Sequence, residues 1–478
     1  MLYSGTSDAG NPCASQTVTH LTDKSLRLTS RAQIHWRLSS YSGGRVQRHQ
    51  LTIRLAHALL AVFLGLAFHT VTWAQTDALP LPTAATEPAS PASIEMHQAV
   101  FDEIWQTVQE RFYDRTLRGL DWPALREQYR PLVAAAPSAE ARSALINRML
   151  SELGASHTRH YTPAEPAYYQ LLDIFSGALR HELPRLFPSG EVTYVGIGVL
   201  TRQIGDKTFV SGVLAGLPAA RAGLQVGDEL VAVDGAPYHP INSFAARYSQ
   251  EVPLQVRRTP DGPVQDLLVV PERLRPNEAF LTAMEESARL IDTEGGRIGY
   301  IHIWSYAGTS YQRLLERQLS TGRLKDADAL ILDLRDGWGG AQPHYLDLFN
   351  TSSPTMVSVD RQGSTSIVNF KWRKPVLMLV NGGTRSGKEI LAYGFKTYGL
   401  GEIVGTRTAG AVLAGRAFVL RDGSLLLVAV LDVLVDGQRL EGRGVTPTID
   451  TPFSLEYAQG KDPQLERAVE LLSRALRG

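Results

Sequence analysis

One short segment, residues 379–390, constrains the fold of this chain more than any other. The apolar run from Pro375 to Val380 predicts a buried strand, and a glycine-rich turn follows it. The turn passes through Ser386 into residues 388–398, whose apolar side chains recur at helical spacing. A serine at such a junction lies beside the free N–H groups of the helix N-terminus, which can stabilise an oxyanion. The segment therefore predicts an α/β layer and marks Ser386 as a candidate nucleophile.

Two simpler interpretations of this segment stay open. Ser386 can serve only as the N-cap of the helix, a common role for serine. The run from Gly382 to Lys388 superficially resembles a phosphate-binding loop, but that loop requires Ser or Thr after its lysine, and Glu389 stands there. We therefore expect Lys388 to be a solvated residue of the first helical turn and only a minor alternative as a base.

The segment resembles the nucleophile segment of the tail-specific, or C-terminal processing, serine peptidases and their tricorn-like relatives. In that family the nucleophilic serine lies three residues before the glutamate that opens the helix. Glu389 has that place here, so the resemblance implies that Ser386 is the nucleophile. The tail-specific branch places a lysine base at the position that Ala411 holds in this chain. Alanine accepts no proton, so either the chain is inactive or its base comes from elsewhere.

The tricorn-like branch takes its base, a histidine, from an N-terminal helical region. Residues 101–153 predict three such helices, because their apolar residues recur at helical spacing. The next residues, Ala155-Ser-His-Thr158, resemble the Thr-Ser-His-Ser segment of tricorn-like proteases. The resemblance implies that His157 is the base for Ser386 and that Ser156 orients it. An imidazole suits this role because its ordinary pKa, about 6.5, lies near neutral pH.

Other interpretations of the histidines remain. His157 can be a loop residue that only hydrogen-bonds the end of the preceding helix. His160 lies in the same loop but outside the matching dipeptide. His302 lies in a strand-like run, residues 298–304, and we expect it to pack in or beside the sheet.

A glutamate and two glycines complete the site that the resemblance implies. Glu441 matches the glutamate that precedes a Tyr-Gly-Val-x-Pro run and completes a Ser-His-Ser-Glu tetrad, where its carboxylate polarises the Ser156 hydroxyl. The residues from Asp333 to Gly340 are similar to the family's Asp-Leu-Arg-Asn-x-x-Gly-Gly. By that match the N–H groups of Gly339 and Gly387 bind the oxyanion. The simpler interpretation is an exposed glutamate and an ordinary glycine turn.

Residues 194–235 resemble a PDZ domain of the bacterial protease type. A short helix over Pro218 to Ala222 precedes a strand, residues 229–233, and a turn at Asp234-Gly235. PDZ domains bind a peptide by strand addition and hold its terminal carboxylate in a glycine-rich loop. By resemblance, that loop contains Val195, Gly196, Ile197 and Gly198. The alternative is a small β domain that only shields the active site.

Strands and helices alternate from about residue 280 onward, which predicts an α/β core. The expected elements include strands at residues 376–380 and 425–435 and helices near residues 309–320 and 341–350. The resemblance implies a crotonase-like core of repeated ββα units, with an N-terminal helical region and an inserted small β PDZ-like domain. The expected parts are a leader with a signal peptide or anchor (1–75), a Pro/Ala/Thr linker (76–93), the N-terminal helical region (94–190), the PDZ-like domain (191–275) and the α/β peptidase core (280–478).

The composition and the N-terminus bear on partners and location. The 478 residues include 48 Lys and Arg and 48 Asp and Glu, so charge gives no reason to expect nucleic acid as a partner. The apolar run from Leu55 to Phe68 has the length of a signal-peptide core and is short for a transmembrane helix. We expect a periplasmic or secreted protein, with membrane attachment only through an uncleaved leader.

The expected leader also contains Cys13, the single cysteine, so a mature chain would have neither a disulfide nor a thiol nucleophile. No cluster has metal-ligand spacing, and no metal or cofactor is expected. Two functions from different classes follow. One is a serine endopeptidase acting on peptide or unfolded-protein substrates. The other is a non-catalytic peptide- or apolar-ligand-binding protein on the same fold.

Overall fold

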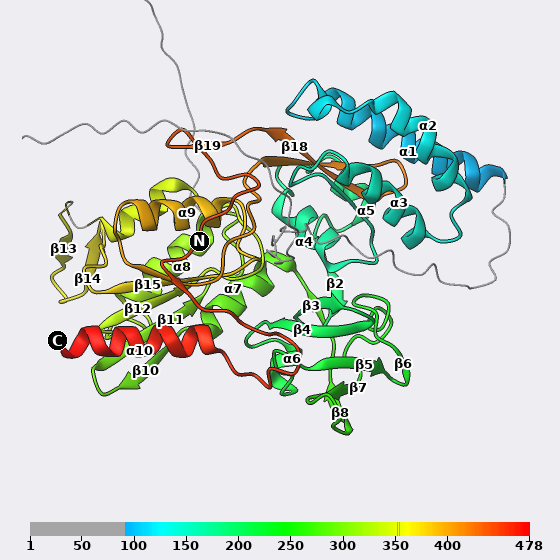
Figure 1. Cartoon of the computed structure of the whole chain (residues 1–478). Coiled ribbons are helices and arrows are strands. Elements are labelled where there is room, and N and C mark those ends of the chain that lie inside the picture. Colours follow the sequence, from blue (N-terminus) through cyan, green and yellow to red (C-terminus); the bar gives the residue numbers. More distant parts are fainter. Residues whose placement is uncertain (1–90, 351, 353) are drawn as a thin grey trace, which may run out of the picture. The chain divides into compact units, whose positions relative to one another are not determined.

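The computed structural model of the chain describes residues 91–350, 352 and 354–478 (Figure 1). The expected leader, its Cys13 and most of the expected linker lie outside these residues. The end of that linker, residues 91–93, belongs to the first helix instead. In this described part of the chain, we find no helix with the length and apolarity that a membrane span needs.

The N-terminal region is helical because its apolar residues recur on one face of each helix. Phe101, Ile104 and Val108 lie on that face of the first helix, and all three are fully buried. The side chains of Asp121 and Ser138 accept backbone N–H bonds and fix where two later helices begin. The elements of this region are α1 (Pro91–Arg111), η1 (Leu117–Gly119), α2 (Trp122–Ala135), α3 (Ala139–Ser151), α4 (Pro166–Ile174) and α5 (Leu183–Leu186).

A short strand ties the loop after α3 to a distant part of the chain. This strand, β1 (Arg159–Tyr161), pairs antiparallel with β18 (Leu425–Leu431), which also pairs with β17 (Ala414–Val419). Apolar side chains of β18 pack in the same cluster as those of α1, α2 and α3. The loop that contains Ser156 and His157 is therefore held against the three-stranded sheet.

The small β domain follows the helical region, as the sequence predicts. Its main sheet has the order β3-β4-β5-β7-β8, with β6 paired to β5, and β2 pairs separately with β9. Val210, Phe244 and Leu254 form its fully buried centre. The elements are β2 (Tyr194–Gly196), β3 (Val199–Ile204), β4 (Lys207–Val213), α6 (Pro218–Arg221), β5 (Glu229–Val233), β6 (Ala236–Pro237), β7 (Val252–Arg257), β8 (Val264–Val269) and β9 (Glu272–Leu274).

The α/β core is built on a six-stranded sheet in the order β10-β11-β12-β15-β16-β21. Strand β10 is antiparallel to its neighbour, and the other five strands are parallel. Because parallel strands end at the same edge of a sheet, the loops after β12 and β15 are neighbours. Gly339 lies in the first of these loops and Ser386 in the second.

Strands and helices alternate along most of the core, as the sequence predicts. The elements are α7 (Pro276–Ser287), β10 (Arg289–Thr293), β11 (Gly296–His302), α8 (Thr309–Ser320), β12 (Ala329–Asp333), η2 (Pro343–Phe349), β13 (Met356–Val359), β14 (Thr365–Val368), β15 (Val376–Val380), α9 (Gly387–Thr397), β16 (Glu402–Gly405), β19 (Leu434–Val435), β20 (Gln438–Arg439), β21 (Ile449–Asp450) and α10 (Pro463–Arg477).

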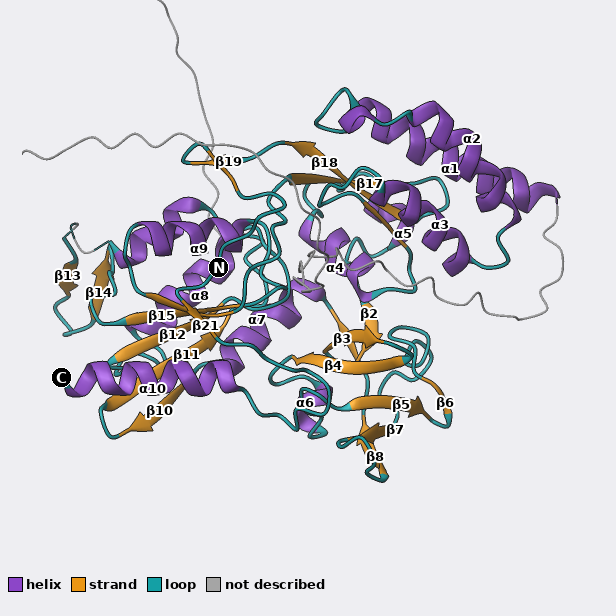
Figure 2. Cartoon of the chain, viewed as in Figure 1, coloured by secondary structure: helices purple, strands orange, loops and turns teal. Residues whose placement is uncertain are grey.

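Helices cover both faces of the core sheet (Figure 2). Leu330 and Leu332 of β12 point to the face that α7, α8 and α9 cover, whereas Ala329 and Ile331 pack against α10. This double burial explains why the core strands are near-continuous apolar runs. The α/β core, the helical region and the inserted β domain confirm the fold class that the sequence predicts.

Two element predictions differ from the structure. The helix expected near residues 341–350 is a 3-10 helix, η2, which begins at Pro343. The strand expected from Leu425 to Val435 ends at Leu431 and resumes only as β19. Asp432 and Val433 separate the two strands. The Asp432 side chain accepts hydrogen bonds from the Val433 N–H and from Arg439, and these local bonds compete with those of the strand ladder.

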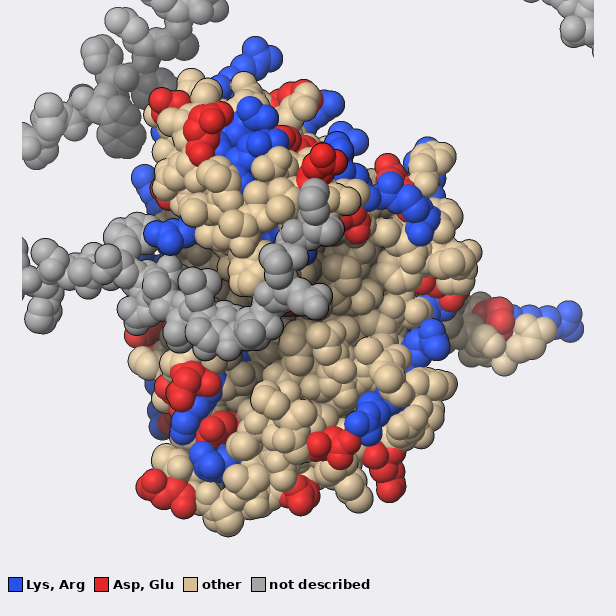
Figure 3. Space-filling view, turned by 90° about the vertical axis from the view of Figure 1, so that its right-hand side faces the viewer, with Lys and Arg blue, Asp and Glu red and all other residues tan. Residues whose placement is uncertain are grey.

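Charged residues of both signs are interspersed on the face drawn in Figure 3. The equal numbers of acidic and basic residues in the sequence account for this mixture. The described part of this face therefore has no broad area of one charge.

Candidate active site

Ser386 lies on a sharp turn between β15 and α9. Its φ is 57° and its ψ is −130°, a conformation that costs free energy for a residue with a side chain. Two backbone contacts hold it there: its N–H donates to the Ala411 carbonyl (2.8 Å) and to the Glu389 carboxylate (3.2 Å). The expected junction is therefore present, and the backbone of Ser386 is fixed from two sides.

The Glu389 carboxylate is fully buried and organises this turn. It also accepts from the Thr408 hydroxyl (2.6 Å) and from the N–H groups of Gly410 (2.7 Å) and Ala411 (2.8 Å). Burial raises the pKa of Glu389, and these hydrogen bonds oppose that rise. Glu389 thereby joins the Ser386 turn to residues 408–411.

The two glycines expected to form an oxyanion hole lie beside Ser386. A Cβ on Gly339 would come within 2.5 Å of the Ser386 Cβ and 3.0 Å of the Gly387 nitrogen. The Gly339 carbonyl accepts from the Tyr306 N–H (3.0 Å), which sets the orientation of its peptide. The N–H of Gly387 is the first of α9 and has no acceptor within the helix. Only glycine fits at position 339, because any side chain there would collide with the turn.

The Ser156–His157 pair makes the contacts that the sequence predicts with Glu441. The Ser156 hydroxyl donates to Glu441 Oε2 (2.9 Å) and lies 2.9 Å from His157 Nδ1, while the Ser156 N–H donates to Glu441 Oε1 (2.9 Å). Since the single hydroxyl proton goes to Glu441, the hydroxyl accepts from Nδ1–H of His157. That tautomer leaves Nε2 of the imidazole without a proton.

One backbone segment, residues 411–413, connects Ser386 and Glu441. The carbonyl of Ala411 accepts from the Ser386 N–H, and the N–H groups of Val412 (2.7 Å) and Leu413 (3.2 Å) donate to Glu441 Oε2. Ala411 thus contributes only main chain at the place where the tail-specific branch has its lysine. This segment therefore links the Ser386 turn to Glu441, which in turn bonds Ser156.

His157 has a lower pKa than its ordinary value suggests. Burial of the imidazole, the largest cause, and the Arg385 charge together lower the pKa to about 4, although the Glu441 charge opposes the shift. His157 is half-buried and packs against Gly415, where an added Cβ would come within 3.2 Å of the His157 Cβ. At neutral pH the imidazole is therefore uncharged and able to accept a proton.

The two alternative histidines have other partners. In His160, Nδ1 lies 2.9 Å from the Ser143 hydroxyl and Nε2 lies 2.9 Å from the Ser424 hydroxyl. His302 bonds the Arg335 carbonyl through Nε2 (3.0 Å) and stacks on a tryptophan. Both side chains are buried in these contacts, so neither presents an unoccupied nitrogen to Ser386.

The expectation for Lys388 is wrong, because its side chain is 0% exposed. Its Nζ donates to the carbonyls of Asp336 (2.8 Å) and Trp304 (3.2 Å), beneath the loop that contains Gly339. Burial lowers the pKa of Lys388 from 10.5 to about 7. The loop after β12 covers this side chain. The position of Lys388 in the first helical turn does not predict that a loop buries it.

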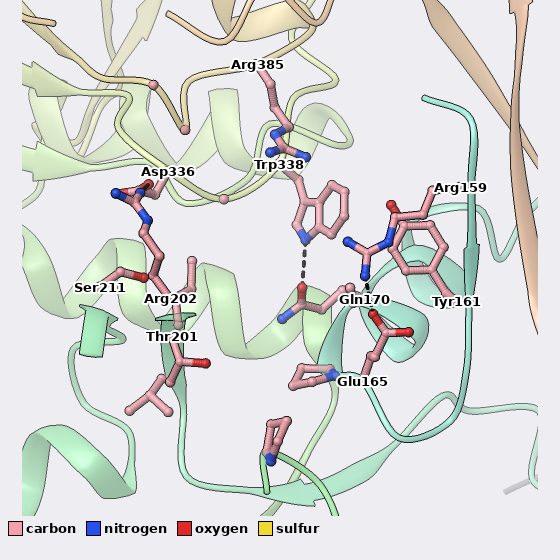
Figure 4. A pocket seen from close by; sticks show the side chains of 18 of the residues that line it. Arg159, Tyr161, Glu165, Gln170, Thr201, Arg202, Ser211, Asp336, Trp338 and Arg385 are labelled. Carbon is pink, nitrogen blue, oxygen red and sulfur yellow. Dashed lines mark hydrogen bonds and ion pairs between the residues drawn. The ribbon is translucent and has the colours of Figure 1, made fainter. Parts of the chain in front are cut away.

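A cleft of about 460 Å³ lies at the turn that leads into Ser386, and Arg385, the residue before Ser386, is one of its lining residues (Figure 4). The indole N–H of Trp338 donates to the Gln170 side chain (2.8 Å) and fixes one wall. Other lining residues come from the loop around β1, from strand β3, from the loop after β12 and from the turn before Ser386. The charged lining residues are Arg159, Glu165, Arg202, Asp336 and Arg385.

The loop expected to bind a peptide carboxylate divides into two parts. Val195 and Gly196 lie in β2 and pair with β9. The carbonyl of Ile197 accepts from the Ala219 N–H (2.8 Å) and that of Gly198 from Leu214 (3.0 Å). Gly198 has a φ of 78° and lies against the start of α6. Only the latter two residues form a loop at the helix, so the expected four-residue loop is shorter.

The described residues contain no group of three or more His, Cys, Asp or Glu side chains that could hold a metal ion. The groups that the structure gathers around the Ser386 turn and Glu441 are a hydroxyl, an uncharged imidazole hydrogen-bonded to Ser156, and two glycine N–H groups. These are the parts of a nucleophilic acyl-transfer site.

Comparison with known proteins locates three matching regions. Residues 297–451 match the peptidase family S41, residues 95–151 the tricorn protease C1 domain and residues 209–258 a PDZ domain. They fall in the α/β core, the helical region and the small β domain respectively.

Individual relatives are similar over most of this chain. A putative tricorn protease homolog 2 of Streptomyces coelicolor is 29% identical over 79% of this chain, which spans 32% of that relative. The chloroplastic carboxyl-terminal-processing peptidase 3 of Arabidopsis thaliana is 28% identical, over 74% of this chain and 68% of that peptidase. The carboxyl-terminal-processing protease of Synechocystis is 26% identical, over 79% of this chain and 87% of that protease. A solved photosystem II D1 C-terminal processing protease superposes with a TM-score of 0.45 and 22% identity, over 77% of this chain and 98% of its own.

Proposed function

We propose that the chain is a serine endopeptidase of peptidase family S41 with a Ser-His-Ser-Glu tetrad, because its regions match that family, the tricorn protease C1 domain and a PDZ domain. Ser386 is the nucleophile, His157 the base, and Ser156 with Glu441 orients the imidazole. The observation that carries this proposal is the Ser156 hydroxyl, which lies between His157 Nδ1 and the Glu441 carboxylate.

The first step forms a bond from Ser386 Oγ to the scissile carbonyl carbon. His157 Nε2 takes the hydroxyl proton, and the resulting imidazolium donates from Nδ1 to Ser156, whose own proton remains directed at Glu441. The carboxylate charge behind the Ser156 hydroxyl stabilises the imidazolium. The lowered pKa of His157 keeps the base in its proton-accepting form throughout the neutral range.

The tetrahedral oxygen receives the N–H groups of Gly339 and Gly387. One such donor contributes about 10²- to 10³-fold in kcat in comparable enzymes. His157 then protonates the leaving amine, and the acyl bond to Ser386 remains. Water, deprotonated by the same imidazole, releases the acid product and restores the hydroxyl.

The PDZ-like domain supports a peptide or unfolded protein as the substrate. The N–H groups of Ile197 and Gly198 have no acceptor among the described residues, and such N–H groups can hold a terminal carboxylate.

The apolar run from Leu55 to Phe68 supports export of the protein to a periplasm or beyond. Fractionation of expressing cells, with sequencing of the N-terminus of the purified protein, tests this export. A protein found in the cytoplasm with residues 1–75 still attached would contradict it.

The proposed chemistry is tested by labelling with a fluorophosphonate probe, followed by mass mapping of the labelled peptide. We expect labelling at Ser386 of the wild type, none in Ser386→Ala, and labelling about 10²- to 10⁴-fold slower in His157→Gln. Ser358→Ala, which alters an exposed serine on β13, is the matched control and should label like the wild type. Labelling of Ser386→Ala, or equal rates in His157→Gln and the wild type, would refute the mechanism.

A further inference from the structure

The cleft beside Ser386 contains an uneven set of charges. Five of its lining residues are charged, and four of these face each other in pairs. Arg159 forms an ion pair with Glu165 (2.6 Å), and Arg202 lies 3.9 Å from Asp336. The fifth residue, Arg385, has no carboxylate partner and no hydrogen-bond acceptor among the described residues. The cleft therefore presents one uncompensated positive charge.

Arg385 is held inside the cleft rather than extended into solvent. Its guanidinium carbon lies 5.7 Å from the centre of the Trp338 ring, and the indole is itself fixed by Gln170 (Figure 4). The side chain is half-buried, and its Nε is a buried donor with no partner. Stacking on an aromatic ring satisfies none of the five N–H donors of a guanidinium. Buried donors in folded proteins are nearly always paired, so this one is suited to a ligand acceptor.

We propose that Arg385 binds a carboxylate of the peptide substrate near the scissile bond, so that the enzyme selects substrates with a carboxylate at that place. This inference rests on the proposed function and adds a substrate class to it. Arg385 directly precedes Ser386, so we expect a carboxylate on its guanidinium to lie within the reach of one arginine side chain from the attacked carbonyl. Two parallel N–H···O bonds give such a pair both strength and a fixed direction.

The carboxylate has two chemical sources, an Asp or Glu side chain or the C-terminal end of the substrate. Both present the same planar acceptor to the guanidinium. They differ in where the cleaved bond lies: a side chain permits cleavage within a long chain, whereas a terminal carboxylate permits cleavage only near the end.

The test compares kcat/KM for peptides that differ in a single charge. One set replaces Asp by Asn or Glu by Gln at each position that flanks the cleaved bond. A second set compares a free C-terminus with an amide at increasing distance from that bond. In at least one set the wild type should favour the charged peptide on the order of 10- to 100-fold, the range for a hydrogen bond to a charged group. The set that responds identifies the source.

Variants assign this preference to one residue. Arg385→Met should lose the preference, and Arg385→Glu should reverse it toward peptides with Lys or Arg. The matched control is Arg289→Met, because Arg289 also stacks on an aromatic ring, Tyr300 (4.1 Å), but lies on β10 and lines none of this cleft. A wild type that shows no charge preference in either set, or a preference that survives in Arg385→Met, would overturn the proposal.

A second readout separates this inference from the proposed function. Arg385→Met should still be labelled at Ser386 by the fluorophosphonate probe, because it retains Ser386 and His157. The charges that act on His157 are those of Arg385 and Glu441, and the first lowers its pKa. The acid limb of kcat/KM for an uncharged peptide should therefore move to higher pH in Arg385→Met. If the wild type labels and cleaves without a charge preference, only the role of Arg385 fails; if it never labels, the proposed function fails.

Discussion

Lys388 gives the sharpest quantitative prediction of this structure. Its ammonium group is 0% exposed, and burial lowers its pKa from 10.5 to about 7. Asp336 and Asp333 oppose this shift and Arg385 adds to it. The folded-state pKa is therefore depressed below the unfolded value, which is the ordinary one for lysine. Between these two values the unfolded chain binds a proton at this site that the folded chain does not.

The sign of the pH dependence follows from that difference. Stability rises with pH wherever the unfolded state binds more protons, so Lys388 should make the protein more stable between pH 7 and pH 10. One proton corresponds to about 1.4 kcal/mol per pH unit. From pH 7.5 to pH 9.5 the free energy of unfolding of the core should therefore rise by about 2–3 kcal/mol. Below pH 7 both states are protonated, and this site adds no further slope.

Lys388→Met removes this titration. The variant leaves the carbonyls of Asp336 and Trp304 without their donor, at a cost of about 1–3 kcal/mol each, but it also removes the free energy that the wild type needs to deprotonate this lysine on folding. Its stability should be close to that of the wild type at pH 7.5 and clearly lower at pH 9.5. Urea unfolding followed by tryptophan fluorescence at pH 7.5, 8.5 and 9.5 measures both slopes.

Lys396→Met is the matched control for this experiment. Lys396 lies on the same helix, α9, and donates to the Thr446 carbonyl (2.8 Å), but its side chain is exposed. The control should retain the wild-type slope. A wild type whose stability is flat over this range, or a Lys388→Met variant with the same slope, would refute the claim that this lysine is uncharged in the folded protein at pH 9.

Three further predictions concern catalysis. Glu441→Gln should lower kcat by at least about 10²-fold, because the amide removes the charge behind the imidazolium; a kcat within threefold of the wild type, measured on a chromogenic peptide, would contradict the relay. Gly339→Ala should abolish turnover, because its Cβ would meet Ser386 at 2.5 Å, whereas Gly177→Ala, with open space at its Cβ, should be fully active. The acid limb of kcat/KM should fall near pH 4 rather than near pH 6.5, because the lowered pKa of His157 keeps the base neutral until then; loss of activity already at pH 6 would argue against this environment.

The sequence predicts the long periodic elements of this fold well. Helix α8 has the expected bounds, residues 309–320, and β15 has the expected bounds, residues 376–380, because each buries a regular apolar pattern. Short elements follow local turn chemistry instead. A single aspartate side chain, Asp432, turns the chain away from the ladder in the strand expected from Leu425 to Val435.

Local sequence patterns alone do not predict which residues meet in the candidate site. Ser156 and Glu441 are 285 positions apart, and no local periodicity indicates that they meet. The resemblance to tricorn-like proteases supplied that pairing. The resemblance does not predict the surroundings of Lys388 or Arg385. Those surroundings depend on the loop that covers Lys388 and on the aromatic ring that stacks on Arg385. Such contacts are tertiary, and a helical or turn position in the sequence does not determine them.

The central claim is that an imidazole from the N-terminal region activates the hydroxyl of Ser386. A crystal structure with a peptide boronic acid bound to Ser386 measures this directly. We expect Nε2 of His157 within about 2.6–3.2 Å of the Ser386 Oγ or of a boronate hydroxyl, with a boronate oxygen facing the N–H groups of Gly339 and Gly387. A boronate attached elsewhere, or an imidazole beyond the reach of one bridging water while Ser156 still bonds Glu441, would contradict the account.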